Sequence, residues 1–428
     1  MTATADLLAL VGAPHMLPAT VRADAARLLA DTLAVGAAGA TAPGAEAILG
    51  VARGFGAGAE ARLLGSAERL PAASAAFVNG YRIHCLEWDA VHEGAVVHAL
   101  SVVTAALGAA IDRRGGCDAD EALTALAVGV DIASGLGLAA TSPLAFFRPA
   151  TAGLIGAALA VARLEGGPLA ETLGLAYSSC AGTMQAHVEG SIALPFQIAN
   201  AARAAIVAAD LAKAGFTAPQ DVLEGPFGYF KLFEAGDLAR YTNDLGRVWR
   251  ISEVSTKPYP SGRASHAVLG ELTGLAEEDL SSLERVEAFV PPLVHRLVGR
   301  PYAPDMTPAY ARLCLPFLAA LMLTDGRIDP RRFTPETFRD PAIAELAGRV
   351  AVTLDGNDDP NALGPQRLLI HEAHGHLDIE IPDTLGSPNA PLSNARAAAK
   401  FDLARELAGP IADPRLFDDP LAYFTEQA

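Results

Sequence analysis

Two prolines set the strongest local constraint on how this 428-residue chain can fold. Pro258 and Pro260 are two residues apart in the segment Lys257–His266, which also carries two cations and an imidazole. Proline fixes its own φ and disfavours helical backbone in the preceding residue, so the segment must be extended or turned. A helix-like run begins at Ala267, and free N–H groups at a helix N-terminus favour anions. The segment is therefore either a carboxylate- or phosphate-binding loop or a proline-stiffened linker between domains.

The hydrophobic pattern changes at this segment. Before it, apolar residues recur at 3- and 4-residue spacing, which predicts helices over residues 21–38, 71–83, 101–111, 119–136, 151–164, 171–181 and 194–214. After it, alternation predicts strands over residues 285–292, 349–354, 367–370 and 377–381. One long apolar helix is expected over 308–323, and the tail from 394 to about 407 returns to a helical pattern.

This order predicts a mainly α protein with two domains, as a chain of this length suits. An all-helical domain would comprise residues 1–251 and 389–428 and would therefore be discontinuous. A smaller α+β domain, residues 252–388, would be inserted into it. The alternative is two consecutive domains followed by an unrelated tail.

Composition excludes several classes of function. The formal net charge of −17 argues against nucleic acid, whose phosphates would be repelled. No apolar stretch is expected to span a membrane uninterrupted: Val102–Ile111 is about half the length that a bilayer needs. The N-terminal residues lack a basic region, so a secretory signal is not expected. The four cysteines form no CxxC pair and are interpreted as reduced thiols in a cytoplasmic protein.

No metal or nucleotide site is predicted. The glycine-containing stretches lack the strand–turn–helix context of a phosphate-binding fingerprint. The stretch His371–His376 contains three histidines but lacks the i, i+4 pair of a zinc-binding helix. It also lies in strand-like alternation, where His371 and His374 would face opposite sides.

Several polar landmarks occur in a fixed order over most of the chain. They are Asn79-Gly80 with the stretch from His84 through Asp89 to His98, Gly215–Pro219 followed by Val222–Gly225, Lys257–Arg263 with His266, and Gly386–Ser393 before Lys400-Phe401. With these landmarks the chain resembles the MmgE/PrpD family, which includes 2-methylcitrate dehydratase, cis-aconitate decarboxylase and iminodisuccinate epimerase. The resemblance implies a helical domain with a smaller α+β lid domain, usually in a homodimer. It also implies action on small di- and tricarboxylates without metal or organic cofactor.

The chain departs from the family pattern at several polar positions. The family's Asp-aromatic-Asp-Asp-Thr run reads Glu87-Trp88-Asp89-Ala90-Val91 here. Leu194 and Gln197 stand where a lysine and a histidine are usual, and Phe147-Arg148 stands where a histidine is frequent. The usual serine and tyrosine of the lid helix are Cys314 and Phe317. The landmarks are thus retained while much of the polar set is rewritten.

His98 is the principal catalytic candidate, because it matches the family's catalytic histidine and because imidazole suits proton transfer near neutral pH. Its apolar surroundings also allow a structural core histidine. Asp89 and Glu87, shortly upstream, would orient it and raise its pKa. A solvated helix face is the alternative for both acids.

The predicted carboxylate-binding residues are mostly cations. Lys257, which matches the family's lysine in the Pro-x-Pro loop, would hold a carboxylate as a point charge, and His266 would be a second acid, base or donor. Arg148 and Arg263 would bind carboxylates bidentately unless they pair with the chain's own acids. His84, in a matched stretch, and Gln197, which stands where the family usually has a histidine, complete the predicted substrate-binding set: Arg148, Arg263, His84 and Gln197.

The sequence therefore predicts a cofactor-independent lyase that abstracts a proton next to a carboxylate of a small di- or tricarboxylate, as a dehydratase or decarboxylase does. An epimerase or isomerase of a dicarboxylate needs the same proton abstraction and is the close alternative. A catalytically silent carboxylate-binding protein is a further alternative, supported by Leu194 and Phe317. The predicted assembly is a cytoplasmic homodimer without nucleic-acid or membrane partners.

Overall fold

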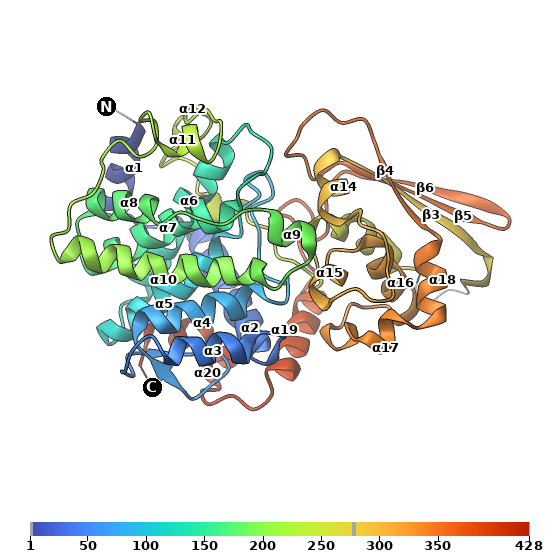
Figure 1. Cartoon of the computed structure of the whole chain (residues 1–428), viewed down its shortest axis with the longest axis horizontal. Coiled ribbons are helices and arrows are strands. Elements are labelled where there is room, and N and C mark those ends of the chain that lie inside the picture. The colour runs from blue at the N-terminus through green and yellow to red at the C-terminus, as the bar shows by residue number, and fades with distance from the viewer. Residues whose placement is uncertain (1–2, 276–279, 428) are drawn as a thin grey trace.

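A computed structural model describes residues 3–275 and 280–427 of the chain. Its buried apolar residues form two separate hydrophobic cores. The first core draws on Leu7–Val254 and on Ala404–Phe424, whereas the second draws on Tyr259–Ile381. Figure 1 shows the corresponding helical body on the left and a smaller part containing a sheet on the right. The fold is mainly α with a small mixed sheet, as predicted.

The helical body is built from closely packed helices. Its longer helices are α1 (Ala3–Gly12), α2 (Ala19–Ala38), α3 (Ala45–Arg53), α4 (Ala72–His84), α5 (Ala99–Arg114), α6 (Ala119–Ala139), α7 (Arg148–Glu165), α8 (Leu169–Ser178) and α10 (Ala193–Lys213). Short elements are α9 (Gln185–Glu189), α11 (Tyr229–Leu232), α12 (Ala239–Thr242), and the paired strands β1 (Ala61–Arg62) and β2 (Arg69–Leu70).

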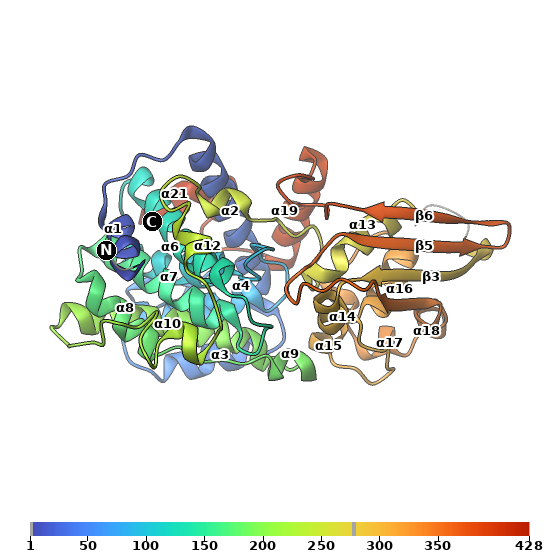
Figure 2. The same cartoon turned by 90° about the horizontal axis from the view of Figure 1, so that it is seen from above.

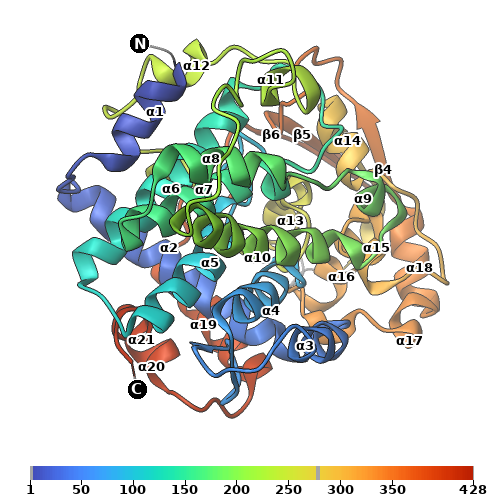
Figure 3. The same cartoon turned by 60° about the vertical axis from the view of Figure 1, so that its left-hand side comes forward.

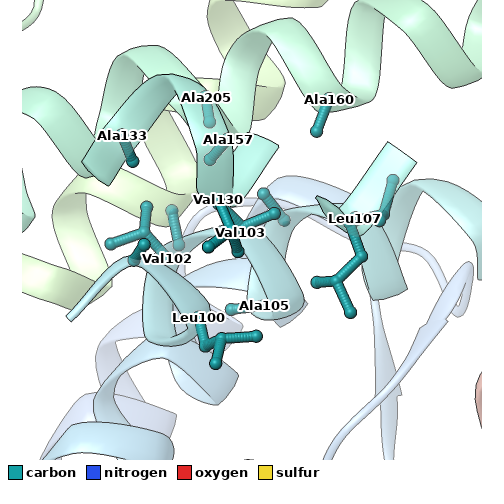
Figure 4. Packing of buried hydrophobic residues seen from close by; sticks show 14 of the residues in the cluster. Leu100, Val102, Val103, Ala105, Leu107, Val130, Ala133, Ala157, Ala160 and Ala205 are labelled. Carbon is teal, nitrogen blue, oxygen red and sulfur yellow. The ribbon is translucent and has the colours of Figure 1, made fainter. Parts of the chain in front are cut away.

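Small residues explain why these helices approach one another so closely. A Cβ atom at Gly156 of α7 would lie 2.3 Å from the carbonyl oxygen of Gly129 on α6, so the crossing requires glycine. Figure 4 shows Ala133, Ala157 and Ala160 beside the valines of α5 and α6. Alanine-rich faces thus let α5, α6 and α7 form the centre of the first core.

The second core lies between a mixed sheet and short helices. The strands are β3 (Leu283–Val290), β4 (Val350–Leu354), β5 (Gln366–Glu372) and β6 (Gly375–Ile381), in the order β4-β3-β5-β6. β3 pairs parallel with β4 and antiparallel with β5, which pairs antiparallel with β6. The helices are α13 (His266–Leu272), α14 (Pro292–Val298), α15 (Pro308–Ala311), α16 (Leu315–Asp325), α17 (Pro335–Phe338) and α18 (Pro341–Gly348). In Figure 2, α16, α17 and α18 lie along one side of this sheet.

The chain then returns to the helical body. α19 (Asn394–Ala408), α20 (Arg415–Asp418) and α21 (Pro420–Thr425) place Ala404, Leu416 and Phe424 in the first core. In Figure 3 this red segment lies beside the blue N-terminal helices, including α2. A buried ion pair joins the two regions, since Lys400 Nζ on α19 lies 2.6 Å from Asp31 Oδ1 on α2.

Most predicted helices and strands are present with boundaries shifted by a few residues. The long helix over 308–323 is wrong: it is split into α15 and α16, and Pro316 lies in the first turn of the second. Proline suits that position because the N–H it lacks would have no helical partner there.

The expectation that no apolar stretch is long enough to span a membrane is wrong for α6. This helix has 21 residues, and by length and composition it could cross a membrane. However, 94% of its most apolar window is buried inside the protein, as in the core helix of a globular domain. It is therefore weak evidence for a membrane span.

The Lys400–Asp31 pair should be important for stability. Burial raises the pKa of Asp31, and Lys400 opposes that shift. Lys400→Met leaves this carboxylate buried without its cation, which should lower the free energy of unfolding by roughly 3–5 kcal/mol. The unpaired carboxyl of Asp31 can lose its buried charge only by binding a proton. The loss of unfolding free energy should therefore be larger at pH 8 than at pH 5. Denaturant unfolding at both pH values measures this.

The matched control is the double variant Asp31→Asn with Lys400→Met, which removes both charges. It should recover part of the loss, because no charge is then left buried alone. A single variant as stable as the wild type, or a double variant whose losses simply add, would contradict this account.

Candidate active site

The loop between α4 and α5 carries the polar residues of the candidate active site. His84 is the last residue of α4, and His98 directly precedes the first turn of α5. Between them Glu87 and Val96 have φ values of 54° and 52°, in the left-handed region that residues with a side chain rarely adopt. Such backbone costs about 1–3 kcal/mol per residue and persists only where its surroundings enforce it.

Backbone pairing holds this loop in place. Val91 pairs with Ser255, two residues before Lys257, and His92 pairs with Val97 inside the loop. The loop is thereby fixed to the Pro-x-Pro segment, and the side chain of Trp88 donates a hydrogen bond to the carbonyl of Pro258. The two sequence segments with the most polar landmarks thus lie against each other.

Asp89 is the centre of a buried cluster. Its Oδ2 lies 2.9 Å from His84 Nδ1 and 3.1 Å from His98 Nδ1, and it also accepts a hydrogen bond from Ser101 Oγ. The contact with His84 has hydrogen-bond geometry, whereas that with His98 is a close charge contact without it. The two imidazole rings meet edge to face with their centroids 4.9 Å apart. One carboxylate therefore orients two histidines.

Lys257 lies on the other side of this cluster. Its fully buried ammonium donates to the carbonyl of Glu87 at 2.8 Å and lies 3.3 Å from Glu87 Oε2. It is 4.0 Å from Asp89 Oδ1. Glu87 also faces His84, with Oε1 3.5 Å from Nε2. The cluster thus combines two carboxylates, a lysine and two histidines. It contains four of the predicted catalytic residues, Glu87, Asp89, His98 and Lys257, together with His84 from the predicted substrate-binding set.

The two histidines have opposite pKa shifts. Burial lowers the pKa of His98, and the neighbouring Lys257 adds to this, although Asp89 opposes it. Burial also acts on His84, but the carboxylates of Asp89 and Glu87 outweigh it and raise its pKa. The surroundings therefore favour a proton on His84 and disfavour a second proton on His98.

Both carboxyl groups of the cluster are held ionised. Burial alone would raise their pKa values, but nearby cations dominate. His84 and Lys257 lower the pKa of Glu87 to about 2, and the two histidines hold the pKa of Asp89 well below its usual range. The cluster consequently carries two negative charges, on Glu87 and Asp89, and two positive charges, on His84 and Lys257.

A small cavity lies beside the cluster. Its walls come from both parts of the molecule: Phe147–Pro149 at the start of α7 on one side, and Gly262–Ala264 with Leu297 and Val298 on the other. His84, Glu87 and His98 line it, and most of the remaining wall is apolar. Helix N-termini favour anions, so the start of α7 adds a positive field to its side of the cavity.

Arg148 lines the cavity but already has a carboxylate partner. Its Nε donates to Glu234 Oε1 at 2.8 Å, and the side chains of both residues are only 1% exposed. Further donors bind the carbonyls of Ala95 and Ser142 and the side chain of Asn361. In this conformation Arg148 joins segments of the protein, and a substrate carboxylate would have to compete with Glu234.

Arg263 and His266 are also satisfied by the protein. Arg263 lines the cavity, but its Nη2 lies 2.7 Å from Glu93 Oε1 and its Nη1 donates to the carbonyl of Leu385. His266 is completely buried and is not among the cavity-lining residues; its Nε2 bonds Ser261 Oγ at 3.0 Å. Burial, with Arg263 and Lys257 nearby, holds its pKa well below the usual range. A one-turn 3-10 helix at Arg263–Ser265 directly precedes His266, and the imidazole of His266 is buried in the protein.

Gln197 lies away from the cluster. It lines a separate pocket with Thr183 and Phe196, and its Nε2 donates to the carbonyl of Thr183 at 3.2 Å. His187, in the short helix α9, lines the cavity beside the cluster instead. Burial and then Arg300 lower the pKa of His187 to about 4, so this imidazole is neutral.

Sequence reasoning did not find the acids that pair with the cavity arginines. Glu234 and Glu93 are far from Arg148 and Arg263 in sequence, and only the tertiary fold brings them together. A single acid in an apolar run, such as Glu234 after Phe233, is the weak signal that a buried partner exists elsewhere.

The cluster also contains a possible ligand set for a metal ion. Ligand atoms of His84, Asp89 and His98 lie within 4.8 Å of one another. This set differs from the stretch His371–His376, whose His371 bonds Glu287 across the sheet at 2.9 Å. The ammonium of Lys257 lies 4.0 Å from Asp89, where its charge would oppose a bound cation. The residues present thus fit a metal ion poorly.

Comparison with known proteins agrees with this architecture. The MmgE/PrpD N-terminal domain matches residues 12–242, and the MmgE/PrpD C-terminal domain matches residues 259–414. The chain belongs to the MmgE/PrpD family. The boundary between the two matches falls at Asn243–Pro258, directly before the centre of the Pro-x-Pro loop.

Characterised relatives within the family are distant. A cis-aconitate decarboxylase-like protein of Aspergillus oryzae is 24% identical over 94% of this chain and 89% of its own length. Cis-aconitate decarboxylase of Homo sapiens is 28% identical over 68% of this chain and 64% of its own length. Cis-aconitate decarboxylase of Aspergillus terreus is 24% identical over 93% of this chain and 87% of its own length.

The opposite shifts of the two histidines predict a measurable titration. In the folded protein His84 should titrate above the usual histidine value of about 6.5, and His98 below it. Asp89→Asn removes the carboxylate that raises both pKa values, so both should fall. Histidine ring NMR signals followed against pH, and assigned with His84→Gln and His98→Gln, measure this. Equal pKa values for the two rings, or a rise in Asp89→Asn, would contradict the electrostatic account.

Proposed function

We propose that this protein is a cofactor-independent lyase that removes a proton next to a carboxylate of a small di- or tricarboxylate. The observation that carries the proposal is the pair of imidazoles that share one carboxylate beside a cavity, with pKa values shifted in opposite directions. Neighbouring groups whose pKa values are pushed apart are the pattern expected of an acid and a base. An elimination needs both.

His98 has the position of the base. Its Nδ1 faces Asp89, which favours the tautomer with the proton on Nδ1 and the lone pair on Nε2. Within residues 3–275 and 280–427, no group hydrogen-bonds Nε2 of this cavity-lining ring. Nε2 is therefore free to take a proton from a substrate carbon, and Asp89 stabilises the imidazolium that results.

His84 and Lys257 would stabilise the negative charge that develops on the substrate. Removing an α-proton leaves an electron pair shared with the adjacent carboxylate, and buried cations stabilise this enolate-like charge. In a dehydration, protonated His84 can give its proton to the departing hydroxyl group, so the products are water and an alkene. In a decarboxylation the carbon–carbon bond breaks to release CO₂, and the same proton is delivered to the carbanion.

The proposed substrate class rests on the family and on the cavity. The relatives named above are cis-aconitate decarboxylases or similar to them, which supports a carboxylate lyase. The arginines at the cavity and the start of α7 favour a small anion over a neutral compound. An epimerase would use the same base and differ only in the face on which the proton returns.

Solvent deuterium separates these reactions. A lyase should convert its substrate to a product of different connectivity, whereas an epimerase returns deuterium to the α-carbon of an otherwise unchanged compound. A catalytically silent binder exchanges nothing. Mass spectrometry of a panel of di- and tricarboxylates, cis-aconitate included, in D₂O with the purified protein decides among the three.

The two central residues should differ kinetically. His98→Asn should mainly lower kcat, by about 10²–10⁴-fold, because a proton-transfer group contributes at the barrier. Lys257→Ala should raise KM and lower kcat, because a cation acts in both the ground and the transition state. Steady-state kinetics on the best substrate from the panel measures both.

His371→Asn is the matched control. His371 is on β5, bonds an acid of its own strand pair and is not among the cavity-lining residues, so this variant should keep wild-type kinetics. Near-full turnover by His98→Asn, or the same loss in His371→Asn, would exclude the proposed base.

Metal removal should not affect the enzyme. Because the ammonium of Lys257 occupies the electrostatic role that a cation would have beside Asp89, dialysis against a chelator should leave turnover and Tm unchanged. Activity that disappears on chelation and returns only with zinc or iron would instead assign His84, Asp89 and His98 as ligands.

A further inference from the structure

Arg300 lies at the boundary between the two parts of the molecule, next to the catalytic cavity. It follows α14 and donates from Nη2 to the carbonyl of His187, near α9, at 2.9 Å. Its guanidinium also stacks on the ring of Tyr310 at 4.7 Å. His187 and Leu297, both bonded to Arg300, line the cavity. Figure 1 shows α9 against α14 and α15 at this boundary.

The charge environment of Arg300 differs from that of the predicted cations. Lys257, Arg148 and Arg263 are each paired with an acid of the protein itself: Glu87, Glu234 and Glu93. Arg300 forms no ion pair with any residue in the described ranges 3–275 and 280–427. Its guanidinium charge thus lacks a paired carboxylate, although Glu87 acts on it from a longer distance.

One end of the guanidinium is also unsatisfied. Nη1 of Arg300 is buried and has no hydrogen-bond partner among the described residues. Leaving a buried charged donor unpaired is costly, and such groups normally find an acceptor. The planar guanidinium presents its donors in a fork that matches a carboxylate.

His187 makes the same place suitable for an anion. Its Nδ1 faces Arg300 Nη2 at 3.4 Å, which favours the tautomer with the proton on Nε2. As His187 is neutral and lines the cavity, Nε2–H is a hydrogen-bond donor without charge. His187 therefore presents a donor at the wall of the cavity, and Arg300 lies directly behind it, in contact with two lining residues although not itself among them.

We propose that Arg300, assisted by His187, binds a second carboxylate of the substrate, one that is not attached to the reacting carbon. This inference rests on the proposed function for the position of the reacting carbon beside His98 and Lys257. It makes Arg300 a specificity-determining residue that selects compounds with two or more carboxylates. Because Arg300 belongs to the second core and His187 to the helical body, the bound carboxylate also connects the two.

The test compares one arginine variant with two anions. Tricarballylate has three carboxylates and no leaving group, and butyrate is a chain of similar length with one carboxylate. Dissociation constants are measured by calorimetry for tricarballylate and by NMR titration for the weaker butyrate. Arg300→Gln should weaken tricarballylate binding about 10- to 100-fold, the usual effect of losing a charge-assisted hydrogen bond. It should change butyrate binding by less than about threefold, since butyrate has no second carboxylate for Arg300 to bind.

Arg203→Gln is the matched control. Arg203 is a half-buried arginine that stacks on Phe55 at 3.9 Å, makes no ion pair within the described part of the chain and is not among the cavity-lining residues. This variant should bind both anions as the wild type does. The comparison separates a loss at the cavity from a general effect of removing a stacked arginine.

The outcomes distinguish this inference from the proposed function. Unchanged tricarballylate binding in Arg300→Gln, or equal weakening of both anions, overturns the inference, since the latter indicates only a displaced α9. If the difference between the anions holds while no panel compound reacts, the second-carboxylate site stands and the proposed reaction fails. If a compound turns over and Arg300→Gln leaves its KM unchanged, the reaction stands and the role of Arg300 fails.

Discussion

The buried carboxylate of Asp89 is the interaction on which the candidate site depends. It is fully removed from solvent, which is unfavourable for an ion unless partners compensate for the lost hydration. Here the partners are two imidazoles, the hydroxyl of Ser101 and the nearby ammonium of Lys257. These groups come from α4, α5 and the Pro-x-Pro loop, so their positions and protonation states are coupled through one charge.

The same requirement explains the strained loop. To place Glu87 and Asp89 between His84 and His98, the chain reverses direction within fourteen residues, and two non-glycine residues adopt positive φ. The bridge to Ser255 and the hydrogen bond from Trp88 tie this loop to the segment that carries Lys257. Strain in the loop is therefore maintained by contacts with the second part of the molecule, and the geometry of the acids depends on how the two parts meet.

The sequence predicted the regular elements well, because alanine- and leucine-rich faces at helical spacing and alternating strands need only local information. The helix over 308–323 fails because a proline that looks like an interior residue is in fact a first-turn residue. For the site, sequence order alone placed Glu87, Asp89 and His98 in one short loop. It could not supply Glu234 or Glu93, since ion pairs between distant segments leave no periodic signal.

Charge balance separates substrate binding from chemistry in this arrangement. Glu87 is long enough to reach both Lys257 and His84, so the cluster has as many negative as positive charges before any ligand enters. Because Glu87 already pairs with Lys257, a substrate carboxylate gains only part of this cation's attraction in the ground state. When a proton moves to His98, negative charge develops on the substrate next to Lys257 and His84, and their attraction increases at that moment. Interactions that strengthen only in the transition state raise kcat rather than affinity. Because the cluster is neutral, much of the energy of substrate binding must come from other parts of the cavity. A helix N-terminus and the apolar walls of the cavity can supply it.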